Sequence, residues 1–412
     1  MGAAIYNTGT IGDITGDFIG NNINSKPYQG YGGAIYNSGI IGNIKGNFIG
    51  NSNYSNTNTD TWGGAILNED AKIASIDGDF IGNYSFNDTN YLARGGAIAS
   101  YRSNINYIKG NFIENYTRAG KNSYGGAIHN SGTTINEISA NFINNYAYAE
   151  EQYANGGAFS SLNSTISKIN SNFTKNYSQS TNGSAYGGAI YSQSTLENIS
   201  GNFTGNHASG KTAAQGGAIY NLGTIGTQDE NNQFAGGIIN STFNDNYVKT
   251  EQGTSEGGAI YNSGTITNII ANFNNNSSQD FGGAIANIAA NSSAAIINNI
   301  EGNFTNNSTD RVGGAIYVSG NESKISNISG LFKSNYIDNK AAEGGAIALR
   351  DGGSIENLNS SFYNNYANGI EKFAKGGAIE IFTGSINNIN GDFVKNRGTG
   401  VTGSLGGAIY QY

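Results

Sequence analysis

Several residue types are absent or scarce in this sequence of 412 residues, and each gap excludes a class of structure. Cysteine is absent, which excludes disulfide bridges and thiolate metal sites. The longest purely apolar run is about four residues, 294–297, which is far too short for a membrane-spanning helix. A charged-then-apolar leader is also missing, so we expect no signal peptide in this sequence.

Charge is sparse as well. Charged residues make up 12% of the chain, and the formal net charge is -8. Because no stretch is rich in Lys and Arg, a nucleic-acid partner has no electrostatic support. The abundance of Gly and Asn by itself suggests disorder. However, Ile and Phe recur at fixed spacings, and disordered chains lack such regularly placed core residues.

The sequence consists of one repeat, copied along its whole length. A Gly-Gly-Ala motif and a Phe-x-x-Asn motif alternate without a miss and define 13 full repeats, most of them 29–32 residues long. A repeat of this length indicates a solenoid, in which each copy packs against its neighbours. Gly-Gly-Ala begins at Gly32, Gly63, Gly95, Gly125, Gly156, Gly187, Gly216, Gly257, Gly282, Gly313, Gly344, Gly376 and Gly406.

The two halves of the repeat differ in regularity. The first half runs from Gly-Gly to Phe and is nearly constant in length, whereas the second half, from Phe to the next Gly-Gly, varies from 9 to 15 residues. In the first half we predict three short strands, at 33–37, 40–44 and 47–49 in one copy, because its Ile and Phe positions are separated by turn-forming Gly and Asn. The second half is rich in Asn, Ser, Thr and Tyr, which predicts a surface loop.

Stacking of the copies determines which side chains face inward. Ile35 and Phe48 have equivalents in every copy that barely vary, so we expect them in the core. We expect the Asn that closes Phe-x-x-Asn to adopt the corner conformation, with its amide hydrogen-bonded to the backbone or to its equivalent in the next copy. The predicted fold class is all-β, a single-stranded right-handed parallel β-helix (β-solenoid) of about 13 coils of roughly 31 residues. We expect residues 1–412 to form one continuous domain.

The alternation of Gly-Gly-Ala-Ile with Phe-x-x-Asn, as in 32–35 and 48–51, resembles the passenger regions of bacterial autotransporters. The nearest likeness is to the polymorphic outer-membrane proteins of chlamydiae, and it covers the whole chain. The resemblance implies a right-handed β-helix that is secreted across the outer membrane and displayed outside the cell, often as an adhesin. A signal peptide, a C-terminal translocator barrel and the cysteines common in chlamydial members are missing here, so we expect a fragment of a longer protein.

Aromatic residues give the main candidate binding surface. Tyr often follows Phe-x-x-Asn directly, and aromatic residues often precede Gly-Gly. Rows of exposed rings can stack on sugars or on a protein partner, and the alternative is that they pack under their own loops. The candidate residues are Tyr84, Tyr116, Tyr146, Tyr177, Tyr31, Trp62, Tyr124 and Tyr186.

Loop length predicts how the first of these rows is covered. The Tyr that follow Phe-x-x-Asn, and the early Ile that follow Phe, occur with long second halves, whereas the two shortest have Ser277 and Ser308 instead. We therefore predict that long loops fold back over this face. In that case Ile81, Ile113, Tyr116 and Tyr146 are not mostly exposed.

Titratable residues give weaker candidates. We interpret His129 and His207 as surface substitutions because they lie 78 residues apart. The insertion from Thr227 to Gly237, with Asp229 and Glu230, is interpreted as a tolerated insertion, with a binding protrusion or a catalytic loop as the alternatives. Spacing across the repeats does not suit a catalytic carboxylate pair, so we interpret four further acidic residues as solvated strand-edge residues: Asp13, Asp17, Asp77 and Asp79.

Two functions remain open on this sequence. The first is a cell-surface structural and adhesive passenger, a rigid rod that displays loops, without enzyme activity, cofactor or metal. Its expected partners are a protein or glycan on a host or neighbouring cell, and the outer membrane through the missing barrel; end-to-end self-association is possible. The alternative is a β-helical polysaccharide lyase or glycoside hydrolase. Such an enzyme needs a cluster of Asp or Glu beside Arg or Lys on adjacent coils, and no such cluster is recognisable in the sequence.

Overall fold

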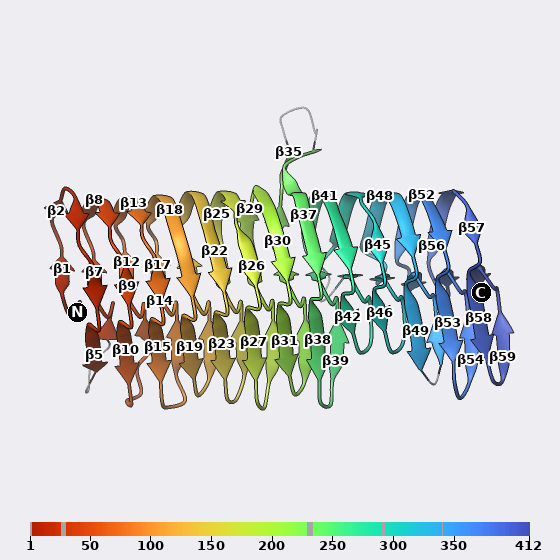
Figure 1. The fold of residues 1–412 in the computed structure, drawn as a ribbon, viewed down its shortest axis with the longest axis horizontal. Helices are drawn as coiled ribbons and strands as arrows, with labels where there is room; N and C mark the ends of the chain where they lie inside the picture. The colour runs from red at the N-terminus through yellow and green to blue at the C-terminus, as the bar shows by residue number, and fades with distance from the viewer. Residues whose placement is uncertain (1, 26–29, 229–233, 290–292, 340) are drawn as a thin grey trace. The chain divides into compact units, whose positions relative to one another are not determined.

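The computed structural model describes residues 2–25, 30–228, 234–289, 293–339 and 341–412. All regular elements in these ranges are β-strands, so none of them contains a helix that could cross a membrane. Internal contacts divide the chain into unit 1, Met1–Gly201 with Asn206–Ala213, and unit 2, Asn202–Gly205 with Ala214–Tyr412. Within each unit, equivalent strands of neighbouring turns pair in parallel, as β18 (Asn104–Ile113) does with β22 (Thr134–Ile143) (Figure 1). The predicted β-solenoid of about 13 turns, roughly 31 residues apart, is confirmed; the single continuous domain stays a prediction.

Strands occupy up to five positions in each turn, which we number by their order in the turn; the second strand is split in two in some turns. The first strand carries the Ile of Gly-Gly-Ala-Ile, and the second and third lead to the Phe. The first strands are β1 (Ile5–Asn7), β7 (Ile35–Asn37), β12 (Ile66–Glu69), β17 (Ile98–Tyr101), β21 (Ile128–Ser131), β25 (Phe159–Asn170, continuing as a second strand), β29 (Ile190–Leu196, likewise), β33 (Ile219–Asn221), β40 (Ile260–Asn262), β43 (Ile285–Ile288), β47 (Ile316–Ser319), β51 (Ile347–Arg350), β55 (Ile379–Ile381) and β60 (Ile409–Gln411).

The second and third strands are separate in some turns and continuous in others. They are β2 (Thr10–Ile11), β3 (Ile14–Thr15), β4 (Phe18–Ile19), β8 (Ile40–Lys45), β9 (Phe48–Ile49), β13 (Lys72–Asp77), β14 (Phe80–Ile81), β18 (Asn104–Ile113), β22 (Thr134–Ile143), β26 (Asn172–Thr174), β30 (Asn198–Thr204), β34 (Thr224–Ile225), β37 (Gly237–Asn244), β41 (Thr265–Asn274), β44 (Ala295–Glu301), β45 (Phe304–Thr305), β48 (Ser323–Lys333), β52 (Ser354–Tyr363), β56 (Ser385–Asn390) and β57 (Phe393–Val394). The three strands predicted at 33–37, 40–44 and 47–49 are therefore present as β7, β8 and β9.

The second half of the repeat also forms strands, so its prediction as a loop is wrong. The fourth strands are β5 (Asn22–Ser25), β10 (Ser52–Ser55), β15 (Tyr84–Asn87), β19 (Tyr116–Ala119), β23 (Tyr146–Ala149), β27 (Tyr177–Ser180), β31 (His207–Gly210), β38 (Tyr247–Thr250), β42 (Ser277–Ser278), β46 (Ser308–Thr309), β49 (Tyr336–Asn339), β53 (Tyr366–Gly369) and β58 (Arg397–Gly400). The fifth strands are β6 (Gly30–Tyr31), β11 (Thr61–Trp62), β16 (Leu92–Arg94), β20 (Asn122–Tyr124), β24 (Tyr153–Asn155), β28 (Ser184–Tyr186), β32 (Ala213–Gln215), β39 (Thr254–Glu256), β50 (Ala342–Glu343), β54 (Phe373–Lys375) and β59 (Gly403–Leu405).

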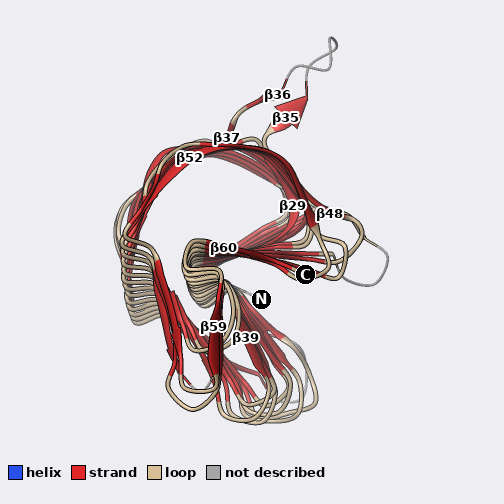
Figure 2. Cartoon of the chain, turned by 90° about the vertical axis from the view of Figure 1, so that its right-hand side faces the viewer, coloured by secondary structure: helices blue, strands red, loops and turns tan. Residues whose placement is uncertain are grey.

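The fourth and fifth strands of a turn form an arch whose interior holds small side chains. The Ser123 hydroxyl donates to the Thr117 hydroxyl at 2.6 Å across this interior, and both residues are buried. Ala147, Ala149 and Ala154 pack together in the same way one turn later. In Figure 2 the fifth strands β39 and β59 lie in an arm that extends away from the long second strand β52. Since Ser, Thr and Ala mark no hydrophobic core in a sequence, nothing in the pattern distinguished this arch from a loop.

The core of each unit consists of stacked Ile and Phe side chains. Ile35 pairs in register with Ile66, and Phe48 pairs with Phe80. The Phe48 and Phe80 rings are parallel, with centroids 4.6 Å apart, and neither is exposed to solvent. Identical residues stack at this spacing only when every turn has the same shape, which explains why these positions hardly vary.

An Asn ladder runs beside the Phe stack at the corner between the third and fourth strands. The Asn83 side-chain amide donates to the Phe48 carbonyl at 2.8 Å and to the Asn115 side-chain carbonyl at 2.9 Å. That carbonyl also accepts from the Asn83 backbone N–H at 2.9 Å. The predicted Asn–Asn bonding is confirmed. The left-handed corner conformation falls one residue earlier than predicted, for example at Glu114 with φ 55°.

The Gly-Gly pair is required by a sharp turn between the fifth strand and the next first strand. Gly125 has φ +63°, and a Cβ there would lie 2.1 Å from the Ile128 carbonyl oxygen. A Cβ on Gly126 would lie 2.0 Å from the Gly157 carbonyl oxygen of the next turn. The first Gly therefore supplies a left-handed backbone, and the second allows two turns to approach closely.

The insertion from Thr227 to Gly237 forms a small antiparallel hairpin of β35 (Thr227–Gln228) and β36 (Phe234–Ala235). Figure 1 shows β35 projecting beyond β37. Asp229 and Glu230 lie outside the described residues.

Candidate binding surfaces

The first four candidate tyrosines form one continuous stack, which we call the outer tyrosine column: Tyr84, Tyr116, Tyr146 and Tyr177. Each residue begins a fourth strand and points away from the arch interior. Neighbouring rings are parallel within 7°, with centroids 4.9 to 5.0 Å apart. Burial, and next the neighbouring Tyr116 and Tyr177, raise the pKa of Tyr146 to about 12. This phenol is therefore uncharged over the physiological pH range.

The residues predicted to be not mostly exposed are indeed half-buried, but the prediction that loops cover them is wrong. Ile81, Ile113, Tyr116 and Tyr146 are all half-buried. Ile81 and Ile113 pair in register, and each Tyr ring is covered by the rings of the adjacent turns. The second halves that were expected to fold over them form the arch strands instead. Stacking within the column therefore accounts for the burial.

The other four candidates, Tyr31, Trp62, Tyr124 and Tyr186, end fifth strands and form a separate row, which we call the groove column. Arg94 occupies the same row between Trp62 and Tyr124, as the strand register shows. Its guanidinium carbon lies 4.0 Å from the Trp62 ring centroid and 5.7 Å from that of Tyr124. The sequence did not single out Arg94, because only the neighbouring turns show an aromatic residue at this position.

The groove column faces the outer side of the first strands. The short Gly-Gly turn brings residues five apart into contact: the Tyr31 and Tyr36 ring centroids are 5.5 Å apart, as are those of Tyr124 and His129. The outer side of the first strand is therefore covered by the fifth strand of the same turn. This arrangement leaves a groove between the two rows of strands.

In unit 1 the groove widens into a cavity of about 380 Å³, which we call the Trp62 pocket. Fifth-strand and first-strand residues line its two sides. The residues on the fifth-strand side are Tyr31, Asp60, Trp62 and Arg94, and those on the first-strand side include Glu69, Tyr101, His129 and Ser131. Of the eight candidate residues, Tyr31 and Trp62 line the pocket itself, and Tyr124 belongs to the adjoining groove wall beside Arg94.

Hydrogen bonds hold the polar groups of the Trp62 pocket in place. Arg94 forms an ion pair with Asp60 at 2.7 Å, and both side chains are mostly buried. The Tyr36 hydroxyl donates to Glu69 Oε2 at 3.0 Å. Burial, followed by this hydrogen bond, raises the pKa of Tyr36 to about 12, so it remains a donor at neutral pH. The pocket therefore presents fixed carboxylate and guanidinium groups beside aromatic rings.

The interpretation of His129 as a surface residue is wrong. The residue is 1% exposed, and its Nδ1 lies 3.4 Å from the Ser160 hydroxyl oxygen. Burial, followed by the nearby Arg94, lowers the pKa of His129 well below its ordinary value, so the ring is neutral. His207 is half-buried and stacks on Tyr177 at 5.1 Å, at the end of the outer tyrosine column in unit 1. The two histidines lie in different rows and do not form a shared site.

The acidic residues near the beginning of the chain belong to a polar ladder on the outside of unit 1. Asp17 Oδ1 accepts from the Asn47 backbone N–H at 2.8 Å, and Asp79 Oδ1 accepts from the Asn111 backbone N–H at 2.9 Å. Asp13 Oδ1 accepts from Asn43 in the same way at 3.0 Å. These carboxylates serve as rungs between turns, which agrees with their interpretation as strand-edge residues.

In unit 2 the equivalent groove is filled by side chains. Phe281 stacks on Tyr317 at 4.7 Å, and both pack with Val312 and Ala348. Further along, Arg350 forms ion pairs with Glu343 and, at 3.7 Å, with the fully buried Glu380. Burial raises the pKa of Glu380, and Arg350 lowers it in part. Apolar packing and internal ion pairs thus occupy the space that is open in unit 1.

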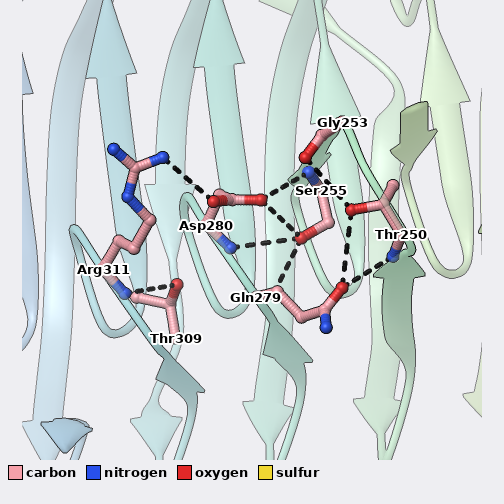
Figure 3. Close-up of polar contacts among 7 residues, drawn as sticks. All are labelled: Thr250, Gly253, Ser255, Gln279, Asp280, Thr309 and Arg311. Carbon is pink, nitrogen blue, oxygen red and sulfur yellow. Dashed lines mark hydrogen bonds and ion pairs between the residues drawn. The ribbon is translucent and has the colours of Figure 1, made fainter. Parts of the chain in front are cut away.

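Side chains replace strand pairing where the arch of unit 2 is shortest (Figure 3). Asp280 accepts from the Ser255 backbone N–H at 3.0 Å and from its hydroxyl at 3.2 Å. Arg311 binds the other oxygen of Asp280 at 3.0 Å. Gln279 Oε1 accepts from the Thr250 backbone N–H at 2.6 Å. These polar groups are engaged with one another and support the short turns.

No group of three or more metal-ligating side chains comes together among the residues that the structure describes. A family model of the Chlamydia polymorphic membrane protein repeat matches residues 240–263 and 301–319. Each matched segment runs from a Phe-x-x-Asn motif to the next Gly-Gly-Ala-Ile, so the resemblance stated from these motifs is confirmed. The comparisons with curated proteins and with solved structures gave no match. The repeat type therefore supports a surface-exposed protein of the outer-membrane class.

Proposed function

We propose that this chain is the displayed part of a bacterial surface protein and that it acts by adhesion, without catalysing a reaction. The observation that carries this proposal is the contrast between the inside and the outside of each turn. Ile and Phe repeat in the core, whereas the positions of the groove column are occupied in successive turns by Tyr31, Trp62, Arg94, Tyr124 and Asn155. A constant core with a varied outer surface suits a scaffold for recognition.

The resemblance to polymorphic membrane proteins supports display outside the cell. In this proposal the partner is a protein or glycan on a host or neighbouring cell. Attachment to the outer membrane through a C-terminal barrel, and end-to-end association of copies, are part of the same proposal. Light scattering over a range of protein concentrations tests the association, because a mass that does not rise with concentration contradicts it.

Adhesion is tested with beads coated with the purified chain. We expect these beads to attach to target cells, and we expect the free chain to compete for attachment. Beads coated with the urea-unfolded chain provide the control for nonspecific adsorption. Attachment that is equal for folded and unfolded chains would contradict the proposal. Protease treatment of intact producing cells tests display, because a chain that faces outward is cleaved without lysis.

A polysaccharide enzyme is the second candidate, and one observation favours it. Asp60, Glu69 and Arg94 lie on adjacent turns and line one pocket, although they are separated in the sequence. In the structure Arg94 is held by Asp60, and Glu69 is held by Tyr36, so these groups support one another. Release of reducing or unsaturated ends from a polysaccharide panel, lost in Glu69→Gln, would replace the adhesive proposal with an enzymatic one.

A further inference from the structure

We propose that the Trp62 pocket binds a neutral sugar residue of a glycan chain. This inference rests on the proposed adhesive function and names the chemistry of one ligand. The pocket measures about 380 Å³, which lies within the roughly 300–1,000 Å³ that is typical of small-ligand sites. All of its lining residues except Asp60 belong to β-strands of unit 1, so its walls are fixed before a ligand arrives.

Aromatic side chains supply the apolar surface of the pocket. The Tyr101 ring centroid lies 5.8 Å from that of Trp62, with the two planes inclined at 59°, so the rings make an angled wall. Tyr31, Leu67 and Leu162 extend the apolar surface. The C–H face of a sugar ring packs on such a surface, while its hydroxyls remain at the edge to form hydrogen bonds.

Polar groups at the edge match the hydroxyls of a sugar. Glu69 Oε2 is bound by Tyr36, which orients the carboxylate and leaves Oε1 without a protein donor among the described residues. Ser131 contributes a hydroxyl that can donate or accept. The neutral His129 ring, whose Nδ1 lies 3.4 Å from the Ser160 hydroxyl oxygen, is part of the pocket wall. Both donors and acceptors are present, as a ligand with several hydroxyls requires.

Charge selects against anionic ligands. Arg94 is neutralised by Asp60, and the nearby Arg102 is bound by Asp70 through two contacts of 2.5 and 2.8 Å. Among the described residues at the pocket, no unpaired cation is therefore available for a phosphate, a sulfate or a nucleic acid. A neutral sugar satisfies this limit, because its hydroxyls can donate to Glu69 without requiring a cationic partner.

Trp62 is the only tryptophan in the chain, so its fluorescence reports on this pocket alone. The whole chain is first screened on neutral tetrasaccharides of glucose, galactose and their N-acetylamino forms, with sulfated counterparts beside them. Each bound tetrasaccharide is then titrated while Trp62 emission and its quenching by acrylamide are followed. We expect saturable binding of a neutral tetrasaccharide, a change in emission, and protection from the quencher. We expect no preference for the sulfated forms.

Variants that retain Trp62 locate the binding. Glu69→Gln removes one charge-assisted hydrogen bond, and we expect affinity to fall by about tenfold or more. Tyr101→Ala removes one aromatic wall and should weaken binding to a similar degree. Tyr107→Ala is the matched control, because Tyr107 is 53% exposed and does not line the pocket. Circular dichroism melts show which variants are folded. The emission and quenching measurements on the wild type test the inference even if a variant does not fold.

Three outcomes overturn the inference. The first is the absence of binding to every neutral tetrasaccharide. The second is binding that leaves Trp62 emission and quenching unchanged. The third is wild-type affinity in both variants, Glu69→Gln and Tyr101→Ala, when both are folded. If beads still attach to cells in any of these cases, the adhesive function stands and its contact is a protein surface or another site; if attachment also fails, the proposed function falls independently.

Discussion

The Asn ladder offers the most direct test of how the turns are joined, through the substitution Asn145→Ala. Asn145 Nδ2 donates to the Phe112 carbonyl at 2.8 Å and to Asn176 Oδ1 at 3.0 Å. Its Oδ1 accepts from the backbone N–H and the side-chain amide of Asn115, both at 3.0 Å. The substitution removes all four bonds. It leaves the Asn115 N–H and the Phe112 carbonyl buried without these partners.

The magnitude follows from those four bonds. A buried intramolecular hydrogen bond contributes about 1 kcal/mol net, and an unsatisfied buried group adds a further cost, so we expect a loss of about 3–5 kcal/mol in the free energy of unfolding. Asn141→Ala is the matched control in the same turn. Its side chain also bonds to Asn in both adjacent turns, at 3.0 and 3.1 Å, but these bonds are exposed to solvent. We expect its loss to stay within about 0.5 kcal/mol.

Urea unfolding followed by far-UV circular dichroism measures both variants. Repeat arrays can unfold in segments, so the urea dependence of each transition must match that of the wild type before midpoints are converted to free energies. Amide hydrogen exchange at Asn115 gives an independent local measurement, because its N–H loses its acceptor only in Asn145→Ala. Equal midpoint shifts for the two variants, or unchanged exchange at Asn115, would refute the argument that burial makes the ladder stabilising.

Three further predictions concern the core, the corner and a buried histidine. Phe142→Ala should cost about 3–5 kcal/mol, whereas the exposed Tyr107→Ala should cost about 0.5 kcal/mol or less; similar urea midpoints would contradict the core assignment. Gly82 has φ +60°, and a Cβ added there would meet no atom within 4 Å. Gly82→Ala should therefore lower the free energy of unfolding by about 1 kcal/mol from backbone strain alone, and Glu114→Gly should raise it by a similar amount. Opposite signs in thermal melts would contradict this prediction. Burial lowers the pKa of His129, so below about pH 6.5 the unfolded chain binds a proton that the folded chain does not. The free energy of unfolding therefore decreases by at most about 1.4 kcal/mol for each unit by which the pH is lowered. His129→Leu should flatten that slope in urea titrations at about pH 5–7, and an unchanged slope would refute the assignment.

The core could be predicted from the sequence because large apolar residues recur at fixed intervals. Ile35 and Phe48 mark the interior of one turn, and their equivalents repeat it, so the solenoid follows from one copy. The arch could not be predicted, because Thr117 and Ser123 fill its interior and such residues are also common in loops. Ser123 accordingly looks tolerant to substitution in the sequence, yet it is buried and hydrogen-bonded in the structure.

The candidate site was predicted only in part. Trp62 and Tyr31 were recognisable as aromatic residues before Gly-Gly, and both line the pocket. Asp60, Glu69 and Arg94 were not, because Glu69 and Arg94 each occur at their position in one turn only, Asp60 has one equivalent at Asp310, and the three residues meet through stacking of adjacent turns. His129 was misplaced for a related reason. Alternation along the first strand shows which side a residue faces, but it does not show that the fifth strand covers that side.

The Gly-Gly-Ala-Ile motif accounts for both the groove and its opening. Its turn places the residue before Gly-Gly opposite the residue after Ile, as Tyr124 and His129 show. By the same spacing Arg94 lies opposite Ala99, a buried position with no side chain beyond Cβ. The rings of Tyr31 and Tyr36 fill the groove in their turn. Further along the groove, the Arg94 guanidinium lies over Trp62 and Ala99 has only a methyl group, so less of the groove is filled. The groove is therefore less filled where Arg94 and Ala99 flank the motif, and the pocket lies beside this pair, while the motif itself stays constant.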